Sequence, residues 1–482
     1  MTELTPEAMQ QTLNELLQSS GVTPSTPLTF VVGLSGGIDS VVLLHLLSSL
    51  PSYLPFSSSS SEESTDLPFL NSTAQNTSNH FFFLKAIHIN HQLQSNANEW
   101  QLFCVSLCEK LNIPIECIFV NAHAKQGEGP EAAARKARYE AFNSVLNEDD
   151  VLLTGHHLDD QIETIFLQML RGTGVDGAAG IRFISQFSTS FLIRPLLIYS
   201  RKSIEEYARK NNINWINDPT NDEINFDRNY LRHQILPVLE KRWPSYRETL
   251  SRFSSNIRQA SELLNEIAEK DYLLIKEDDT QSFAHCLDIN KLKELSISRQ
   301  NNLVRHWLSV EGYSPPSKNL LTQIHAAIAA RIDASPIVSW ANVELRRYKN
   351  KIYLLDKNRE KIPQNFSLKI SNWRQGERVK IPGYGVLELM SSENDGIKSS
   401  CFSSEDIQIK LRQGGEKCKP KNRNKSQVLK KIFQEKNIPP WCRDTIPIVF
   451  IDGEIAAVVN EFYCSPFAAE NETGLIIVRV PE

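Results

Sequence analysis

The sequence is poor in cysteine and has no long apolar run. None of the eight cysteines lies in a C-x-x-C pair, which argues against a disulfide scaffold, a zinc ribbon or a dithiol redox motif. No apolar run approaches the roughly 18 to 20 residues that span a bilayer. The first residues, MTELTPEAMQQTLNELL, lack a basic segment followed by an apolar core. We therefore expect a cytoplasmic protein without a membrane anchor.

An excess of positive charge is also missing from the chain as a whole, because 52 Lys and Arg residues face 57 Asp and Glu residues. Two stretches differ from this balance. From Lys410 to Asp444 there are 11 basic and 3 acidic residues, and from Arg228 to Arg258 there are 7 and 2. Such stretches are most often solvated faces, but both also fit a polyanionic partner.

The length of 482 residues predicts two or three domains. In residues 1–225, short apolar segments at 29–34, 83–90, 115–120 and 151–154 alternate with helical patterns. This alternation predicts an α/β domain with a doubly wound parallel sheet. The serine-rich segment 51–80 interrupts it, and we expect that segment to be a disordered insertion.

The predicted secondary structure changes after residue 225. Residues 226–356 are expected to form a mostly helical domain that ends in a strand pair at 337–348 and 351–356. Residues 366–482 combine short strands, glycine turns and one helix, VLKKIFQEK, which is typical of a small α+β domain.

The motif SGGIDS, Ser35 to Ser40, lies between a predicted strand and a predicted helix. Paired glycines let backbone N–H groups approach a phosphate, and the helix N-terminus adds partial positive charge. Ser35 and Ser40 could donate hydroxyl hydrogen bonds, and Asp39 could hold the Mg²⁺ of a triphosphate. A plain helix-capping turn is the alternative. The motif is not a Walker loop, because it lacks G-x-x-x-x-G-K-[ST].

A second motif, GHHLDDQIETIFLQMLRGTG at 155–174, follows the fourth predicted strand. Its apolar residues recur at helical spacing, which places Asp159, Asp160 and Glu163 on the polar side near the helix start. Acidic residues there often only complement the helix dipole. Three carboxylates with two histidines at the carboxyl end of a strand favour instead a site for Mg²⁺ or an ammonium group.

A third polar segment, PEAAARKARYEAF, places Glu131, Arg135 and Arg138 on one side of a predicted helix. A solvent-facing, salt-bridged helix is one interpretation, and arginines that face phosphates are the other. His88 and His91 end the second predicted strand, but without a third ligand nearby we do not expect a metal site there.

Taken together and in this order, SGGIDS, HINHQLQ, EAAARKARYEAF and TGHHLDDQIETIFLQMLRGTG resemble the N-type ATP pyrophosphatases, and within them the tRNA(Ile)-lysidine synthetases. The resemblance continues through RPLL at 194–197, WINDPTN at 215–221, DRNYLRHQILP at 227–237, RQGGE at 412–416 and PPWCRDTIP at 439–447. It covers nearly the whole chain apart from residues 51–80.

The resemblance implies a ligase that uses ATP and Mg²⁺ to adenylate the C2 oxygen of the wobble cytidine in the CAU anticodon of an isoleucine tRNA. The ε-amine of L-lysine then displaces AMP, so that the codon read changes from AUG to AUA and the charging identity from methionine to isoleucine. A homodimer is left open.

The resemblance also assigns candidate residues. Those expected at ATP are Ser35, Gly36, Gly37, Ile38, Asp39 and Ser40, with Asp39 at the metal. Those expected in catalysis are Asp39, Asp159, Asp160 and Glu163, and those expected at lysine are Glu131, Asp160 and Glu163. Those expected at tRNA or phosphates are Arg135, Arg138, His157, Arg194, Arg228, Asn229, Arg232, Arg412, Lys430, Lys431 and Arg443.

Three other functions compete with this one. A tRNA 2-thiolation enzyme of the same superfamily would need a C-x-x-C pair or iron–sulfur ligands, which this sequence lacks. A non-catalytic, nucleotide-sensing RNA-binding protein would have no need of the acidic helix. A glutamine-dependent synthetase would need a glutaminase domain or partner, and no such domain is evident.

Overall fold

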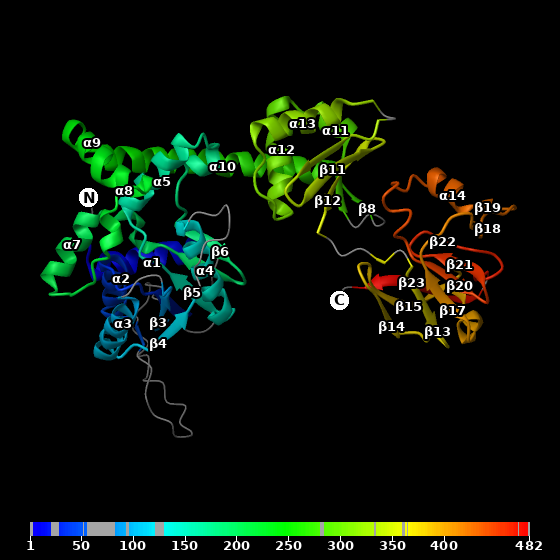
Figure 1. The fold of residues 1–482 in the computed structure, drawn as a ribbon, viewed down its shortest axis with the longest axis horizontal. Coiled ribbons are helices and arrows are strands. Elements are labelled where there is room, and N and C mark those ends of the chain that lie inside the picture. Colours follow the sequence, from blue (N-terminus) through cyan, green and yellow to red (C-terminus); the bar gives the residue numbers. More distant parts are fainter. Residues whose placement is uncertain are drawn as a thin grey trace, which may run out of the picture. The chain divides into compact units, whose positions relative to one another are not determined.

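The computed structural model describes residues 3–20, 28–51, 53–54, 82–92, 96–120, 130–279, 284–331, 334–358, 362–363, 365–470 and 472–480. The chain forms two compact units, Met1–Leu263 and Leu264–Glu482 (Figure 1). The boundary between them in the sequence falls within helix α10 (Tyr246–Ile275), and the division into three domains stays a prediction. The predicted insertion 51–80 lies almost entirely outside the described residues.

A seven-stranded sheet forms the centre of the first unit. Its strand order is β2-β3-β1-β5-β7-β6, and β4 also pairs with β3. The described pairings are parallel except that of β6 with β7. The strands are β1 (Leu28–Gly33), β2 (Tyr53–Leu54), β3 (Phe82–Asn90), β4 (Ile115–Phe119), β5 (Asp150–Leu153), β6 (Ile184–Phe187) and β7 (Ser190–Ile193). The predicted parallel sheet is thus confirmed, and β6 adds an antiparallel edge strand.

Helices cover both faces of this sheet, because successive residues of a strand point to opposite sides. In β1, Phe30 and Val32 join the larger core cluster and Val31 joins a smaller one. The larger cluster receives residues from α1 (Pro6–Ser20), α2 (Ile38–Ser48), α3 (Ala97–Leu111) and α7 (Arg201–Lys210), and the smaller one from α4 (Pro130–Val145). The sheet is therefore doubly wound, as expected. Among the described residues, no helix is long and apolar enough to cross a bilayer.

Helix α5 (Leu158–Leu170) packs against the segment that leads into α10. This segment comprises α8 (Asp227–Tyr230), a π-helical turn (Leu231–Ile235) and α9 (Leu236–Arg242). The π-turn ends two residues before Pro237, which has no N–H to continue a regular helical ladder. Leu158, Ile162, Leu231, Leu236 and Tyr246 form the shared apolar core, so that the basic residues of α8 and of the π-turn lie close to α5. The shorter helices of the unit are α6 (Val175–Ala178) and the 3₁₀ turns Pro195–Ile198 and Pro219–Asp222.

The second unit begins with the end of α10 and an antiparallel sheet in the order β10-β11-β12-β9-β8. Its strands are β8 (Lys276–Asp279), β9 (Ala284–Asp288), β10 (Ile337–Trp340), β11 (Val343–Tyr348) and β12 (Lys351–Asp356). The helices α11 (Ile289–Glu294), α12 (Ile297–Val310) and α13 (Lys318–Ala329) share a core with it. The predicted pairing of a strand ending at 348 with the strand 351–356 is confirmed, but the segment 337–348 is two antiparallel strands, β10 and β11, and not one. Strands β8 and β9 are additions to the mostly helical part that the sequence predicted.

The C-terminal part is rich in strands and contains one α-helix among its described residues, α14 (Leu429–Glu435). One sheet has the order β13-β17-β20-β21-β22 and another the order β14-β15-β23-β16. The strands of the first are Ser367–Ile370, Ile407–Lys410, Ile448–Ile451, Glu454–Val458 and Phe462–Tyr463, and those of the second are Arg378–Ile381, Gly385–Glu393, Thr473–Val480 and Ile397–Lys398. A short pair, β18 (Lys417–Cys418) and β19 (Gln427–Val428), and the 3₁₀ turn Ser399–Ser403 complete it. The expected α+β character is confirmed.

Candidate active site

The glycine loop connects β1 to α2 and is held by its two serines. Ser40 is buried, and its hydroxyl donates to the carbonyl of Gly37 at 3.0 Å and accepts from the backbone N–H of Ser35 at 3.1 Å. The two serine hydroxyls lie 3.1 Å apart, and Ser35 itself is exposed. Ser40 therefore fixes the shape of the loop, while Ser35 can reach a ligand.

Two glycines allow the close approach of chain segments around this loop. Gly36 has φ +86°, and a Cβ there would lie 3.0 Å from Ile216, whose backbone N–H donates to the Gly36 carbonyl at 2.9 Å. A Cβ on Gly155 would lie 2.8 Å from the backbone of Asp39. The WINDPTN segment and the segment before α5 are thereby brought against the loop.

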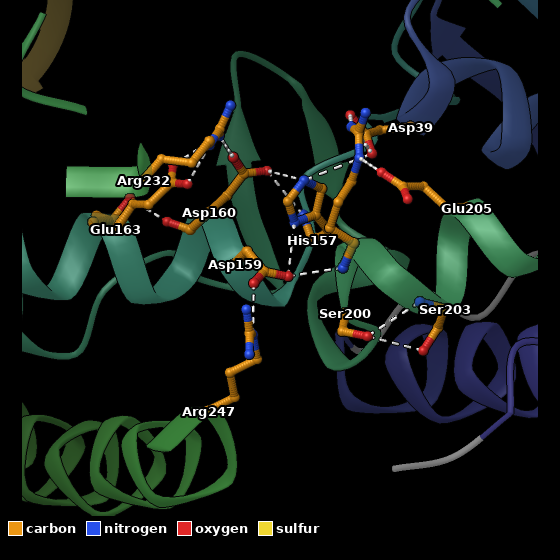
Figure 2. A network of polar contacts seen from close by, with 12 residues as sticks. Asp39, His157, Asp159, Asp160, Glu163, Ser200, Ser203, Glu205, Arg232 and Arg247 are labelled. Atoms are coloured by element: carbon orange, nitrogen blue, oxygen red, sulfur yellow. Dashed lines mark hydrogen bonds and ion pairs between the residues drawn. The ribbon is translucent and has the colours of Figure 1, made fainter. Parts of the chain in front are cut away.

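The start of α5 places a histidine among three carboxylates. Figure 2 shows the imidazole of His157 between Asp39 on one side and Asp159 and Asp160 on the other. Its Nε2 lies 3.6 Å from both Asp39 Oδ1 and Asp160 Oδ2, and its Nδ1 lies 3.8 Å from Asp159 Oδ2. His157 is buried and lies close to all three carboxylates. The sequence predicted instead that this side chain contacts phosphate or RNA.

Asp159 is fully engaged by groups from two other helices. Its Oδ2 accepts from the backbone N–H of Arg201 at 2.7 Å, and its Oδ1 accepts from Arg247 Nε at 2.7 Å. Asp159 is 9% exposed. The carboxylate therefore ties α5 to the starts of α7 and α10.

Glu163 is completely buried and receives two guanidinium groups. Arg228 Nε lies 2.9 Å from Oε2, and Arg232 donates to Oε1 at 2.7 Å and to Oε2 at 3.0 Å. Burial raises the pKa of Glu163, and the hydrogen bonds from Arg232 oppose that rise. The carboxylate faces these arginines, and direct contact with a substrate would require them to move.

Asp160 is the least committed of the three carboxylates on α5. Its Oδ2 accepts from the backbone N–H of His157 at 3.1 Å, and Arg232 lies 3.6 Å from Oδ1. Burial opposes the ionisation of Asp160, but its electrostatic interactions with the neighbouring His157, His156 and Arg228 and the hydrogen bond from the His157 backbone outweigh it and lower its pKa to about 2. Burial lowers the pKa of His156 to about 3. At neutral pH, Asp160 is thus an anion beside a neutral His156.

The predicted basic residues separate into two groups. Arg135 and Arg138 are exposed on α4, and Lys430 and Lys431 are exposed on α14. Others bond within the protein: Arg194 to the Arg182 carbonyl, Asn229 to the carbonyls of Thr220 and Glu223, Arg412 to Asp444, and Arg443 to the Ile438 carbonyl and the Tyr348 hydroxyl. The buried side chains of Arg194 and Asn229 therefore stabilise the backbone segments whose carbonyl groups they contact. The side chain of Glu131 lies outside the described residues.

Sequence reasoning missed two residues of the site, Arg201 and Arg247. Arg201 Nη1 lies 2.9 and 2.7 Å from the two carboxylate oxygens of Asp39. Arg247 reaches Asp159 from the first turn of α10 and also bonds to Glu240 at 2.7 Å. A signal for Arg201 was present, because Ser200 is a good N-cap residue just before a helical pattern. That signal locates a helix start but does not predict the partner of Arg201, Asp39 on the neighbouring helix α2.

Comparison with known proteins identifies the family of this chain. Residues 5–239 match the model of the PP-loop domain, residues 287–353 that of the TilS substrate binding domain, and residues 407–480 that of the TilS substrate C-terminal domain. A tRNA(Ile)-lysidine synthase of Coxiella burnetii is 35% identical over 470 residues, which cover 97% of this chain and 95% of that protein. One of Alkalilimnicola ehrlichii is 35% identical over 98% of this chain and 97% of that protein. The family resemblance found in the sequence motifs is confirmed, and the chain belongs to the tRNA(Ile)-lysidine synthase family.

Proposed function

We propose that this protein ligates L-lysine to carbon 2 of the wobble cytidine in the CAU anticodon of isoleucine tRNA. ATP would first adenylate the C2 oxygen with release of pyrophosphate, and the ε-amine of lysine would then displace AMP. The observation that carries the proposal is the convergence of the glycine loop, the carboxylates of α5 and the arginines of α8 and the π-turn in one place. The names of the full-length relatives support the same reaction.

The glycine loop would hold the triphosphate of ATP, which PP-loop proteins use. Its backbone lies at the start of α2, where N–H groups and the helix dipole favour anions. The exposed hydroxyl of Ser35 can add a hydrogen bond to a phosphate oxygen. Activation of this kind is needed because the C2 oxygen leaves readily only after it carries AMP.

Asp39 would hold the Mg²⁺ that accompanies the triphosphate. Among the described residues, no group of three acidic, histidine or cysteine side chains forms a protein-only metal site. Mg²⁺ bound to nucleotides commonly takes only one or two carboxylates and completes its shell with phosphates and water. The partly exposed carboxylate of Asp39 in the first turn of α2 fits that donor set. The ion would neutralise phosphate charge during adenylation.

Asp160 would bind the ammonium end of lysine, because it is ionised and has lone pairs left over. Glu163 would support it indirectly by fixing Arg228 and Arg232. A carboxylate with a pKa near 2 is a weak base, so the group that finally takes the proton of the amine stays open among the acidic candidates, Glu131 included.

The exposed basic residues of α4 and α14 would bind the tRNA backbone, together with the stretches 228–258 and 410–444. Contacts with phosphates give position and affinity and do not select bases. A cytoplasmic location accords with a tRNA substrate, and a homodimer stays a prediction.

The test is the incorporation of radiolabelled L-lysine into an unmodified CAU isoleucine tRNA transcript in the presence of ATP and Mg²⁺. Label should enter this RNA with the wild type, and neither with Asp39→Ala nor with a CAU methionine tRNA. Labelled methionine tRNA would refute the proposed specificity. Release of pyrophosphate with tRNA but without lysine transfer would show that a different nucleophile is used.

A further inference from the structure

Arg201 lies at the position on Asp39 that a cation would occupy. One guanidinium nitrogen, Nη1, bonds to both carboxylate oxygens at 2.9 and 2.7 Å. Both side chains are partly exposed, 38% for Arg201 and 28% for Asp39. The guanidinium therefore occupies both oxygen atoms that a metal ion would need.

The backbone of Arg201 is fixed, while its side chain is long and partly exposed. The backbone N–H donates to Asp159 at 2.7 Å, and the preceding Ser200 caps α7 through the N–H of Ser203. Beyond Asp39, the guanidinium bonds to Glu205 at 3.1 Å, and Glu205 is also shared with Arg209. A long, partly exposed side chain on a fixed pivot can change partners without moving the helix.

We propose that Arg201 competes with the metal ion for Asp39 and moves onto the triphosphate when the nucleotide and its metal bind. Without ligand, Arg201 neutralises Asp39. With ligand, Mg²⁺ takes the carboxylate, because an ion about 2.1 Å from the oxygens and a guanidinium 2.7 Å from them cannot both occupy the same side. The released guanidinium suits phosphate oxygens, to which arginine forms paired, charge-assisted hydrogen bonds.

This exchange makes Arg201 a positioning residue with two opposite effects. It weakens the binding of a metal alone, since the contact with Asp39 must be broken first. It strengthens the binding of metal and nucleotide together, since a new contact replaces the old one. If Arg201 had only a structural role, its loss would not strengthen the binding of the metal alone while weakening the binding of metal and nucleotide together. The inference rests on the proposed metal role of Asp39.

The experiment measures two affinities of the nucleotide-free, full-length protein and its Arg201→Met variant. Mn²⁺ binding is followed by water-proton relaxation, and the part that depends on Asp39 is obtained by subtracting the titration of the matching Asp39→Asn variant. Binding of Mg²⁺·ATP is followed by calorimetry without tRNA or lysine. We expect Arg201→Met to bind Mn²⁺ at Asp39 roughly three- to tenfold more tightly and Mg²⁺·ATP more weakly by a similar factor.

Two further variants serve as controls. Arg209→Met removes an exposed arginine from the same helix, one that shares Glu205 but does not bond to Asp39, and it should change neither affinity. Arg201→Lys keeps the charge and should return both affinities towards those of the wild type. The proposal is overturned if Arg201→Met weakens both ligands together, or if it leaves Mn²⁺ binding at Asp39 unchanged. Because neither measurement involves tRNA or lysine, a failure of lysine ligation would be seen separately.

Discussion

Arg232 bonds to both carboxylate oxygens of the completely buried Glu163, at 2.7 and 3.0 Å. The two residues are 69 positions apart in the sequence, and the contact joins the acidic helix α5 to the basic π-turn before α9. Glu163, which the sequence predicts at lysine, thus holds in place Arg228 and Arg232, which the sequence predicts at tRNA or phosphates.

Glu163→Gln should destabilise the first unit, because it leaves Arg228 and Arg232 without their shared negative charge. Loss of one partner from a buried ion pair costs about 3 to 5 kcal/mol. Here the arginines are 26% and 34% exposed, so that solvent screening should reduce the cost to about 2 kcal/mol. Urea unfolding at neutral pH measures this loss in the free energy of unfolding.

A control is Glu240→Gln, which removes the exposed partner of Arg247 and should change stability by less than about 0.5 kcal/mol. Equal effects of the two substitutions would contradict the anchoring role of Glu163.

Gly36→Ala should distort the glycine loop, because φ +86° is strained for alanine and the new Cβ would lie 3.0 Å from Ile216. We expect a loss of about 1 to 2 kcal/mol in the free energy of unfolding and at least a tenfold weaker binding of Mg²⁺·ATP, measured by calorimetry. The neighbouring Gly37 provides the control, since its φ is −71° and its nearest contact is Ser35 at 3.5 Å. Gly37→Ala should leave the free energy of unfolding nearly unchanged. A stable Gly36→Ala variant that binds ATP normally would refute this account of the loop.

Much of this site could be predicted because its motifs are local. The six residues of the loop and the carboxylates of α5 each lie within one turn or one helix, so that spacing alone places them. Arg201 is 162 positions from Asp39, and Arg247 is 88 positions from Asp159. Only the tertiary fold makes them neighbours. The burial of Glu163 could not be seen for the same reason: the polar side of α5 looked open to a ligand, and α8 with the π-turn covers it.

In the second unit, β8 and β9 were missed for a different physical reason. The segments KEDD and AHCLD have little of the alternation that marks a half-buried strand. They become strands because β8 pairs with β9 and β9 pairs with β12, which buries Leu287 in the core that α12 shares; Cys286 is buried as well. Tertiary pairing decides their conformation in this case, against weak local preference.

Stability should fall as the pH drops below about 6.5, because burial holds five of the described histidines neutral in the fold, His91 and His156 most strongly. Burial lowers the pKa of His91 to about 4, aided by the charge of Arg138, and burial lowers that of His156 to about 3. Between these values and 6.5, the unfolded chain binds more protons than the folded one, so that acid favours unfolding. Asp160, with a pKa of about 2, adds to the loss of stability below its ordinary pKa of 3.8.

Unfolding by urea at pH 7, 5.5 and 4.5 would measure the slope of the free energy of unfolding against pH, and His91→Asn should flatten that slope. A slope that His91→Asn leaves unchanged would contradict the prediction.

Lys430 and Lys431 should contribute to tRNA affinity without contributing to stability. Both are exposed on α14, whose buried residues Leu429, Ile432 and Phe433 hold the helix in place without them. If each lysine neutralises one phosphate, the double substitution by alanine should lower the slope of log affinity against log salt by about 1.5.

Lys436 is a matched control close to the same helix, because it already bonds to the carbonyl of Glu461 at 3.0 Å and lies 3.5 Å from its carboxylate. Lys436→Ala should therefore reduce the slope less and stability more. Filter binding of isoleucine tRNA between 50 and 200 mM salt separates these cases. An unchanged slope for the lysine pair would place the RNA contact elsewhere in the basic stretch 410–444.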